Sequence, residues 1–163
     1  MTTRPPDSPF DPERDLVVER TINAPATLVW KAWTEPEHLK KWFTPPPWRT
    51  VDCEIDLRPG GIFRTVMRSP EGQDSPNHWC YLDVVANERL VWTTALGAGY
   101  RPGSGKGFIL TAIITLESDG DGTKCVARAM HHDSASRQHH EDMGFYDGWG
   151  TVLKQMADLA EAM

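Results

Sequence analysis

The sequence lacks any long apolar run. No stretch approaches the roughly 20 residues that a membrane-spanning helix needs. Residues 1–14 are rich in proline and lack the apolar segment of a signal peptide. We therefore expect a cytoplasmic protein with no membrane partner, in which residues 1–14 form a flexible tail.

Positive charge is also in short supply. Lys and Arg number 17 against 23 Asp and Glu, which gives a net charge of −6. Proteins that bind nucleic acids usually carry a basic patch. The adjacent lysines Lys40 and Lys41 are interpreted as the solvated face of a short helix, so no nucleic-acid partner is expected.

Cysteine is scarce and has no metal-ligand spacing. Cys53, Cys80 and Cys125 fall in strand-like segments and include no C-x-x-C pair, which predicts buried free thiols in a reducing compartment. The chain also lacks a G-x-S-x-G nucleophile elbow and a glycine-rich phosphate loop. We therefore expect no metal site and no cofactor.

The pattern that is present predicts one α+β domain over residues 15–163. The 163 residues are 39% hydrophobic and 25% charged, as is usual for a globular domain. Alternating residues predict strands at 16–22, 48–56, 62–68, 78–86, 89–96, 106 or 107–117, and 123–131. A helix from Pro25 to about Trp33 and a second short helix follow the first strand. Short turns between consecutive strands indicate an antiparallel sheet with helices on one face.

Helix signals flank this sheet. Thr34 and Glu37 match a capping box for the second short helix. Residues 133–163 are interpreted as one long helix, with Asp133 or Ser134 as its cap. Residues 97–107 have no periodicity and are predicted to be a loop that forms a flexible lip, with Tyr100 at its edge.

The predicted last helix contains glycines that a helix disfavours. Each of Gly144, Gly148 and Gly150 should cost roughly 1 kcal/mol relative to alanine. Gly144 and Gly148 share one face, beside a bulky stripe that begins with Phe145 and Trp149. This pattern favours a helix lying across a sheet, with a notch and a possible cavity between them.

Three sequence blocks resemble a known family. They are Ala24-Pro25 with Val29-Trp30 and the run 35–43, then 56–61 with Phe63, and finally 144–149. Together they resemble the family named for the activator of Hsp90 ATPase, over about residues 15–163. The resemblance implies membership of the START-like (SRPBCC), polyketide-cyclase-like superfamily. It also implies a helix-grip fold, in which a seven-stranded antiparallel curved sheet wraps round a long C-terminal helix and encloses a cavity.

The superfamily typically holds an apolar ligand between helix and sheet. The bulky inward-facing residues are therefore the candidate ligand-binding set: Trp42, Phe63, Met67, Trp79, Trp92, Tyr100, Phe145, Trp149, Val152 and Met156. The alternative for each of them is that it simply fills the core. A ligand for such a site would be a small hydrophobic or aromatic molecule.

A histidine cluster is the strongest candidate for other chemistry. His131, His132, His139 and His140 lie among carboxylates, a combination that can bind a transition metal. However, adjacent helical residues point about 100° apart and no H-E-x-x-H pattern is present, so we expect a polar helix start or a pH-sensitive cavity mouth.

Three functions remain open from the sequence. The first is binding of a small apolar ligand. The second is a cyclase, dehydratase or hydrolase that uses the same cavity with a His or carboxylate base. The third is a chaperone regulator or stress-response protein with an Hsp90-type partner, although the Hsp90-binding domain of the eukaryotic co-chaperone is replaced here by a short tail. Either a monomer or a homodimer is compatible with the sequence.

Overall fold

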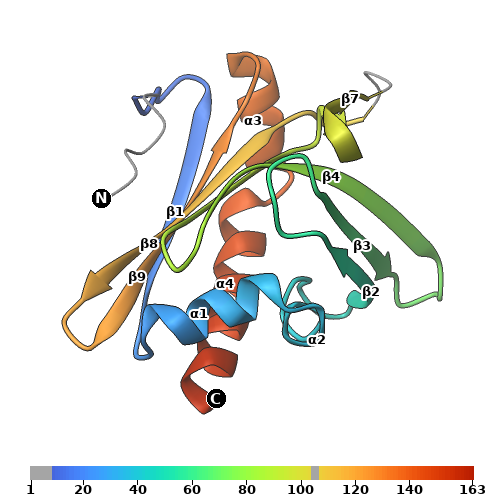
Figure 1. The fold of residues 1–163 in the computed structure, drawn as a ribbon. Helices are drawn as coiled ribbons and strands as arrows, with labels where there is room; N and C mark the ends of the chain where they lie inside the picture. The colour runs from blue at the N-terminus through green and yellow to red at the C-terminus, as the bar shows by residue number, and fades with distance from the viewer. Residues whose placement is uncertain (1–8, 104–106) are drawn as a thin grey trace.

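The computed structural model describes residues 9–103 and 107–163. It shows an α+β fold in which a curved sheet holds a long helix (Figure 1). The elements of this fold are β1 (Asp15–Ile22), α1 (Ala26–Thr34), α2 (Pro36–Leu39), β2 (Arg49–Ile55), β3 (Ile62–Arg68), β4 (Asp74–Val85), β5 (Arg89–Thr93), β8 (Thr111–Asp119), β9 (Gly122–Met130), α3 (Ser134–Asp142) and α4 (Phe145–Ala162).

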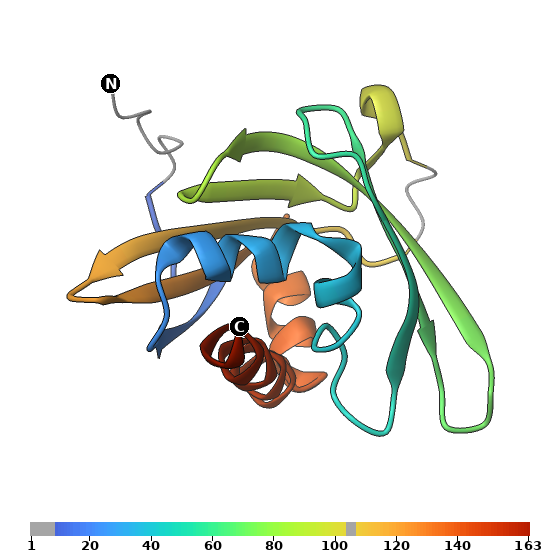
Figure 2. The ribbon, with the colours of Figure 1, turned by 60° about the horizontal axis from the view of Figure 1, so that its bottom comes forward.

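The sheet has seven strands in the order β1-β9-β8-β5-β4-β3-β2, and all neighbours are antiparallel. This confirms the predicted fold class. Register shifts between Thr50 and Asp52 and between Tyr81 and Asp83 interrupt the pairing. Such irregularities increase the twist of a strand, and here they accompany a sheet that curls strongly from β1 to β2 (Figure 2).

Helix α4 lies on the concave side of the sheet, with α1 and α2 beside it (Figure 2). Its predicted apolar stripe is buried: Val152 and Leu153 are almost fully covered and Met156 is completely covered. The stripe repeats with helical spacing, whereas the sheet supplies alternate residues, as in β9, where every second side chain is buried. The core therefore forms where these two periodicities meet.

The last helix is not continuous, and the prediction of one helix over 133–163 is wrong. The helix is divided into α3 and α4 by Gly144, whose φ of 94° and ψ of 36° are left-handed. A residue with a side chain is strained in this conformation, so glycine here serves to end one helix and begin the next. The predicted cap is confirmed on α3, where the Asp133 carboxylate accepts a hydrogen bond of 2.8 Å from the Ser136 amide.

Replacement of Gly144 and of Gly148 by alanine should change the stability of the protein in opposite directions. We expect Gly144→Ala to lower the free energy of unfolding by about 1–2 kcal/mol, because the side chain disfavours positive φ. Gly148 lies inside α4 with no atom within 4 Å of an added Cβ, so Gly148→Ala should stabilise the protein by about 0.5–1 kcal/mol. Urea unfolding of the two variants measures both effects. Stabilisation by Gly144→Ala would contradict the assigned role of this residue.

Several local predictions need correction. Thr34 does not cap α2; it ends α1, and its hydroxyl donates a hydrogen bond of 2.7 Å to the Trp30 carbonyl. The segment predicted as a loop contains a short hairpin, β6 (Leu96–Gly97) and β7 (Arg101–Pro102), around the 3-10 turn Ala98–Tyr100. Strand β8 begins at Thr111, later than predicted, and the alternative start at Lys106 lies outside the described residues.

The expected tail falls partly outside the described residues, which begin at residue 9. Within residues 9–14, a turn leads into β1, and the Asp11 amide donates to the Asp15 carboxylate at 2.9 Å. The Arg128 guanidinium donates to the same carboxylate at 2.6 Å and to the Pro9 carbonyl at 2.9 Å. None of the helices in the described part of the chain has the length and apolar character needed to span a bilayer.

Candidate functional site

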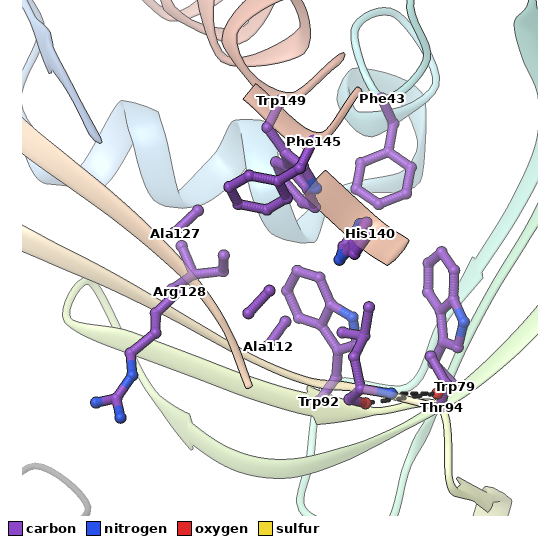
Figure 3. Close-up of a pocket in the computed structure, with 13 residues that line it drawn as sticks. Phe43, Trp79, Trp92, Thr94, Ala112, Ala127, Arg128, His140, Phe145 and Trp149 are labelled. Carbon is purple, nitrogen blue, oxygen red and sulfur yellow. Dashed lines mark hydrogen bonds between the residues drawn. The ribbon is translucent and has the colours of Figure 1, made fainter. Parts of the chain in front are cut away.

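A cavity of about 80 Å³ lies between the sheet and the start of α4 (Figure 3). Its surface is apolar. The residues that line it are Phe43, Trp79, Trp92, Thr94, Leu110, Ala112, Ile114, Ala127, Arg128, Ala129, His140, Phe145 and Trp149. Figure 3 shows the Arg128 guanidinium directed away from this space, where its ion pair with Asp15 holds it on the outer side of the sheet.

Three alanines on two neighbouring strands account for the unfilled space. Ala112 on β8 pairs directly with Ala129 on β9, and Ala127 lies two residues away on the same face of β9. All three are buried and line the cavity. Because their side chains end at Cβ, they do not reach Phe145 and Trp149 of α4, which line the opposite side of the cavity. Small residues at inward strand positions are the sequence signal for this cavity, and the candidate ligand-binding set does not include them.

Aromatic rings form the side walls. Phe43 packs against Trp79 with centroids 5.8 Å apart, and Trp79 stacks on Trp92 at 6.4 Å. Trp149 lies 6.4 Å from Phe145 and 6.3 Å from Phe43. These contacts link α4 to β4 and β5 through rings rather than through flexible side chains, which holds the walls in place.

A groove of about 480 Å³ adjoins the cavity. Cavity and groove share the residues Phe43, Trp79, His140, Phe145 and Trp149. The groove adds Met67 and Val152, together with Gly144 and Gly148, the two glycines predicted to form a notch. The bare backbone at Gly144, which precedes α4, and at Gly148 within α4 therefore forms one side of the groove.

The structure places the predicted ligand-binding residues in three different settings. Trp79, Trp92, Phe145 and Trp149 line the cavity, whereas Met67 and Val152 line the groove. Trp42, Phe63 and Met156 belong to the packed core and are at most 1% exposed. The Trp42 indole N–H donates to the Ala32 carbonyl at 2.9 Å.

Tyr100 lies away from both spaces. It is half-exposed, and its ring covers Gly60 so closely that an added Cβ there would lie 2.8 Å from the ring. Gly60 therefore has to be glycine both for this contact and for its φ of 82°. Phe43, His140 and the three cavity alanines are lining residues that the candidate set did not include.

The histidine cluster is divided into a hydrogen-bonded pair, in which His131 is buried and His140 half-buried, and two exposed members. Nε2 of His131 and Nδ1 of His140 are 2.8 Å apart, and Nδ1 of His131 is 2.8 Å from the Arg14 carbonyl oxygen. His132 and His139 are exposed. Among the described residues, no three His, Cys, Asp or Glu side chains are close enough together to hold a metal ion.

Burial determines which groups carry charge near the site. Desolvation, with smaller contributions from His131 and His139, lowers the pKa of His140 to about 4, so this ring is uncharged near neutral pH.

Desolvation also raises the pKa of the Cys53 and Cys125 thiols to about 12. All three cysteines are free, as predicted, but only Cys80 and Cys125 are fully buried, whereas Cys53 is partly exposed. Thiols held in the protonated form are poor nucleophiles.

Charged side chains form ion pairs between neighbouring strands of the sheet. The Arg64 guanidinium contacts Asp52 at 2.7 Å and Glu54 at 3.2 Å, whereas Arg68 pairs with Asp74 of β4 at 2.7 Å. The carboxylates of these pairs are exposed and line neither the cavity nor the groove. They stabilise strand pairing and offer no acid or base to the site.

Comparison with known proteins assigns the chain to a family. The model of the Activator of Hsp90 ATPase homolog 1-like protein family matches residues 23–161. The chain belongs to this family. The curled sheet closed by a long C-terminal helix is the START-like fold that the three sequence blocks implied. A search of curated proteins gave no significant match.

Solved structures of family relatives agree with this architecture. A protein of Nitrosomonas europaea is 47% identical, with a TM-score of 0.90 over 94% of this chain and 97% of that chain. A protein of Chromobacterium violaceum is 25% identical, with a TM-score of 0.69 over 91% of this chain and 97% of that one. An AHSA1-like protein of Aeromonas hydrophila, 20% identical, shares the fold with a TM-score of 0.67 over 91% and 92% of the two chains.

Proposed function

We propose that the protein binds a small hydrophobic or aromatic molecule between its sheet and its C-terminal helix. The observation that carries this proposal is the apolar cavity on the alanine floor, which adjoins a larger groove and shares five lining residues with it. Ligand sites usually enclose roughly 300–1,000 Å³, so the cavity of about 80 Å³ is too small to hold a whole ligand. The groove, at about 480 Å³, is large enough for the rest of the molecule.

This division constrains the shape of the ligand. A dry cavity of about 150 Å³ holds benzene in another protein, and the present cavity is smaller. The edge of an aromatic ring or a short branched alkyl group would therefore enter the cavity. The wider part of the molecule would lie in the groove, along the glycine side of α4 and against Met67 and Trp79. Burial of its apolar surface would drive binding.

A binding role is favoured over catalysis by the groups that line the two spaces. In the described residues, the cavity and groove have no carboxylate and no thiol in their walls. His140 is the titratable ring there, and a pKa of about 4 makes it a weak base at neutral pH, whereas an efficient general base has a pKa near the working pH. The cyclase, dehydratase or hydrolase alternative would need a stronger base than this.

Titration with small aromatic molecules tests the proposal. Naphthalene, indole and isobutylbenzene should each change the tryptophan fluorescence, because Trp79, Trp92 and Trp149 line the site. We expect dissociation constants in the micromolar range. Saturation at about 100 times the dissociation constant should stabilise the fold by about 2.7 kcal/mol, measurable as a rise in Tm. If no member of the set changes either the fluorescence or Tm, the proposal is rejected.

A further inference from the structure

His140 is the polar side chain among the five residues that line both the cavity and the groove. Among the residues shared by cavity and groove, the other four are Phe43, Trp79, Phe145 and Trp149. The His140 ring lies edge-to-face against Phe145, with centroids 5.0 Å apart. It is half-buried at the start of the groove, so a ligand that occupies both spaces passes this ring.

A chain of hydrogen bonds fixes which nitrogen of His140 carries the proton. The Arg14 carbonyl can only accept, so Nδ1 of His131 donates to it over 2.8 Å. An uncharged imidazole has one N–H, which makes Nε2 of His131 an acceptor. The partner of this acceptor, 2.8 Å away, is Nδ1 of His140, and it must therefore donate. In the uncharged pair, the remaining nitrogen of His140, Nε2, carries no proton.

This bare nitrogen is available to a ligand. Nε2 lies across the imidazole ring from Nδ1 and so points away from His131. Among the described residues, no protein group hydrogen-bonds to it. The low pKa of His140 keeps the ring uncharged near neutral pH and so preserves the lone pair. A ligand that covers this nitrogen removes it from water, and a ligand that brings a hydrogen-bond donor avoids leaving the acceptor unpaired.

We propose that Nε2 of His140 accepts a hydrogen bond from the ligand, so that the preferred guest is a hydroxylated aromatic molecule with an apolar end in the cavity. This rests on the proposed binding function. A carboxylate is disfavoured, because its oxygens would face a lone pair and its charge would be buried among aromatic rings. The site thus distinguishes phenol-like molecules from both plain hydrocarbons and aromatic acids.

Matched ligands test this preference. At roughly pH 8, where a histidine of ordinary pKa is also uncharged, calorimetry compares naphthol, its methyl ether and naphthoate. We expect naphthol to bind about three- to tenfold more tightly than the ether, as one hydrogen bond provides, and naphthoate to bind most weakly. In His140→Phe the ratio between naphthol and ether should fall to about one. The control His139→Phe changes an exposed neighbour and should keep the ratio.

A second measurement does not depend on any ligand. Nitrogen NMR of histidine-labelled protein distinguishes a protonated ring nitrogen from a bare one, and we expect His140 to carry its proton on Nδ1. In His131→Phe this preference should be lost, and the ratio between naphthol and ether should fall towards one, because His140 then lacks its acceptor. Thermal unfolding checks that each variant is folded.

The outcomes separate the two proposals. If naphthol and its ether bind the unmodified protein equally well, or if Nε2 of His140 carries the proton, the hydrogen bond to His140 is rejected while apolar binding stands. If none of the probes binds, both the preference and the binding function are rejected.

Discussion

Replacement of Ala127 by valine is expected to weaken binding of naphthalene by about tenfold or more. Ala127 forms part of the cavity floor on β9, and its Cβ faces the space that the ligand enters. The two added methyl groups would exclude about two buried methylene-sized groups of the ligand, at roughly 0.8 kcal/mol each, which corresponds to about a factor of ten in affinity.

The same substitution should not destabilise the protein. Valine favours strands, and it would occupy empty space rather than displace neighbours. Ala160→Val is the matched control, because Ala160 is fully buried on α4 and lines neither the cavity nor the groove. We expect that variant to lose about 1–3 kcal/mol of stability through overpacking and to keep its affinity. Unaltered affinity in a folded Ala127→Val protein would contradict the location of the site.

The second large effect concerns stability. Phe63→Ala should lower the free energy of unfolding by about 3–5 kcal/mol. Phe63 is 1% exposed, stacks on Tyr81 at 5.4 Å, and meets the rings of Trp79 and Trp92 at 5.0 and 5.2 Å. Its removal would leave a void at the centre of the aromatic cluster, where rigid neighbouring rings prevent collapse.

Phe10→Ala provides the control for this change. Phe10 is 49% exposed, and its ring lies 5.7 Å from the Arg128 guanidinium carbon. An exposed cation–π contact contributes about 0.5–1 kcal/mol, so the same substitution should have a small effect here. Denaturant unfolding of both variants measures the difference. A loss of stability below about 1 kcal/mol for Phe63→Ala would contradict the view that this ring organises the core.

Much of the fold was predictable from the sequence, because strand alternation and helical spacing are local properties. Alternation predicted the strand at 123–131, which is β9, and the stripe that contains Val152, Leu153 and Met156 predicted the correct buried face of α4. The break at Gly144 was missed because a glycine inside an apolar helical pattern also fits a continuous helix. What decides between the two is the left-handed φ, which spacing does not reveal.

The site was less predictable because it depends on register. Alternation indicates that Ala112 and Ala129 face inward, but their direct pairing across β8 and β9 follows from the hairpin turn and the curl of the sheet. Trp42 and Phe63 have the same apolar character as Trp79 and Trp92, yet they belong to the packed core. Residue type alone does not separate a ring that fills the interior from one that borders a space.

The anchor of the histidine pair is a main-chain atom. The Arg14 carbonyl accepts both the backbone N–H of His131, at 3.0 Å, and its ring Nδ1–H, at 2.8 Å. The side chain at position 14 has no part in either bond. A substitution at this position therefore leaves unchanged which histidine nitrogens donate and which accept. The direction of the hydrogen bonds at the groove entrance thus depends on the path of the backbone and on the two imidazole rings. Only a change in that path or in those rings can reverse it.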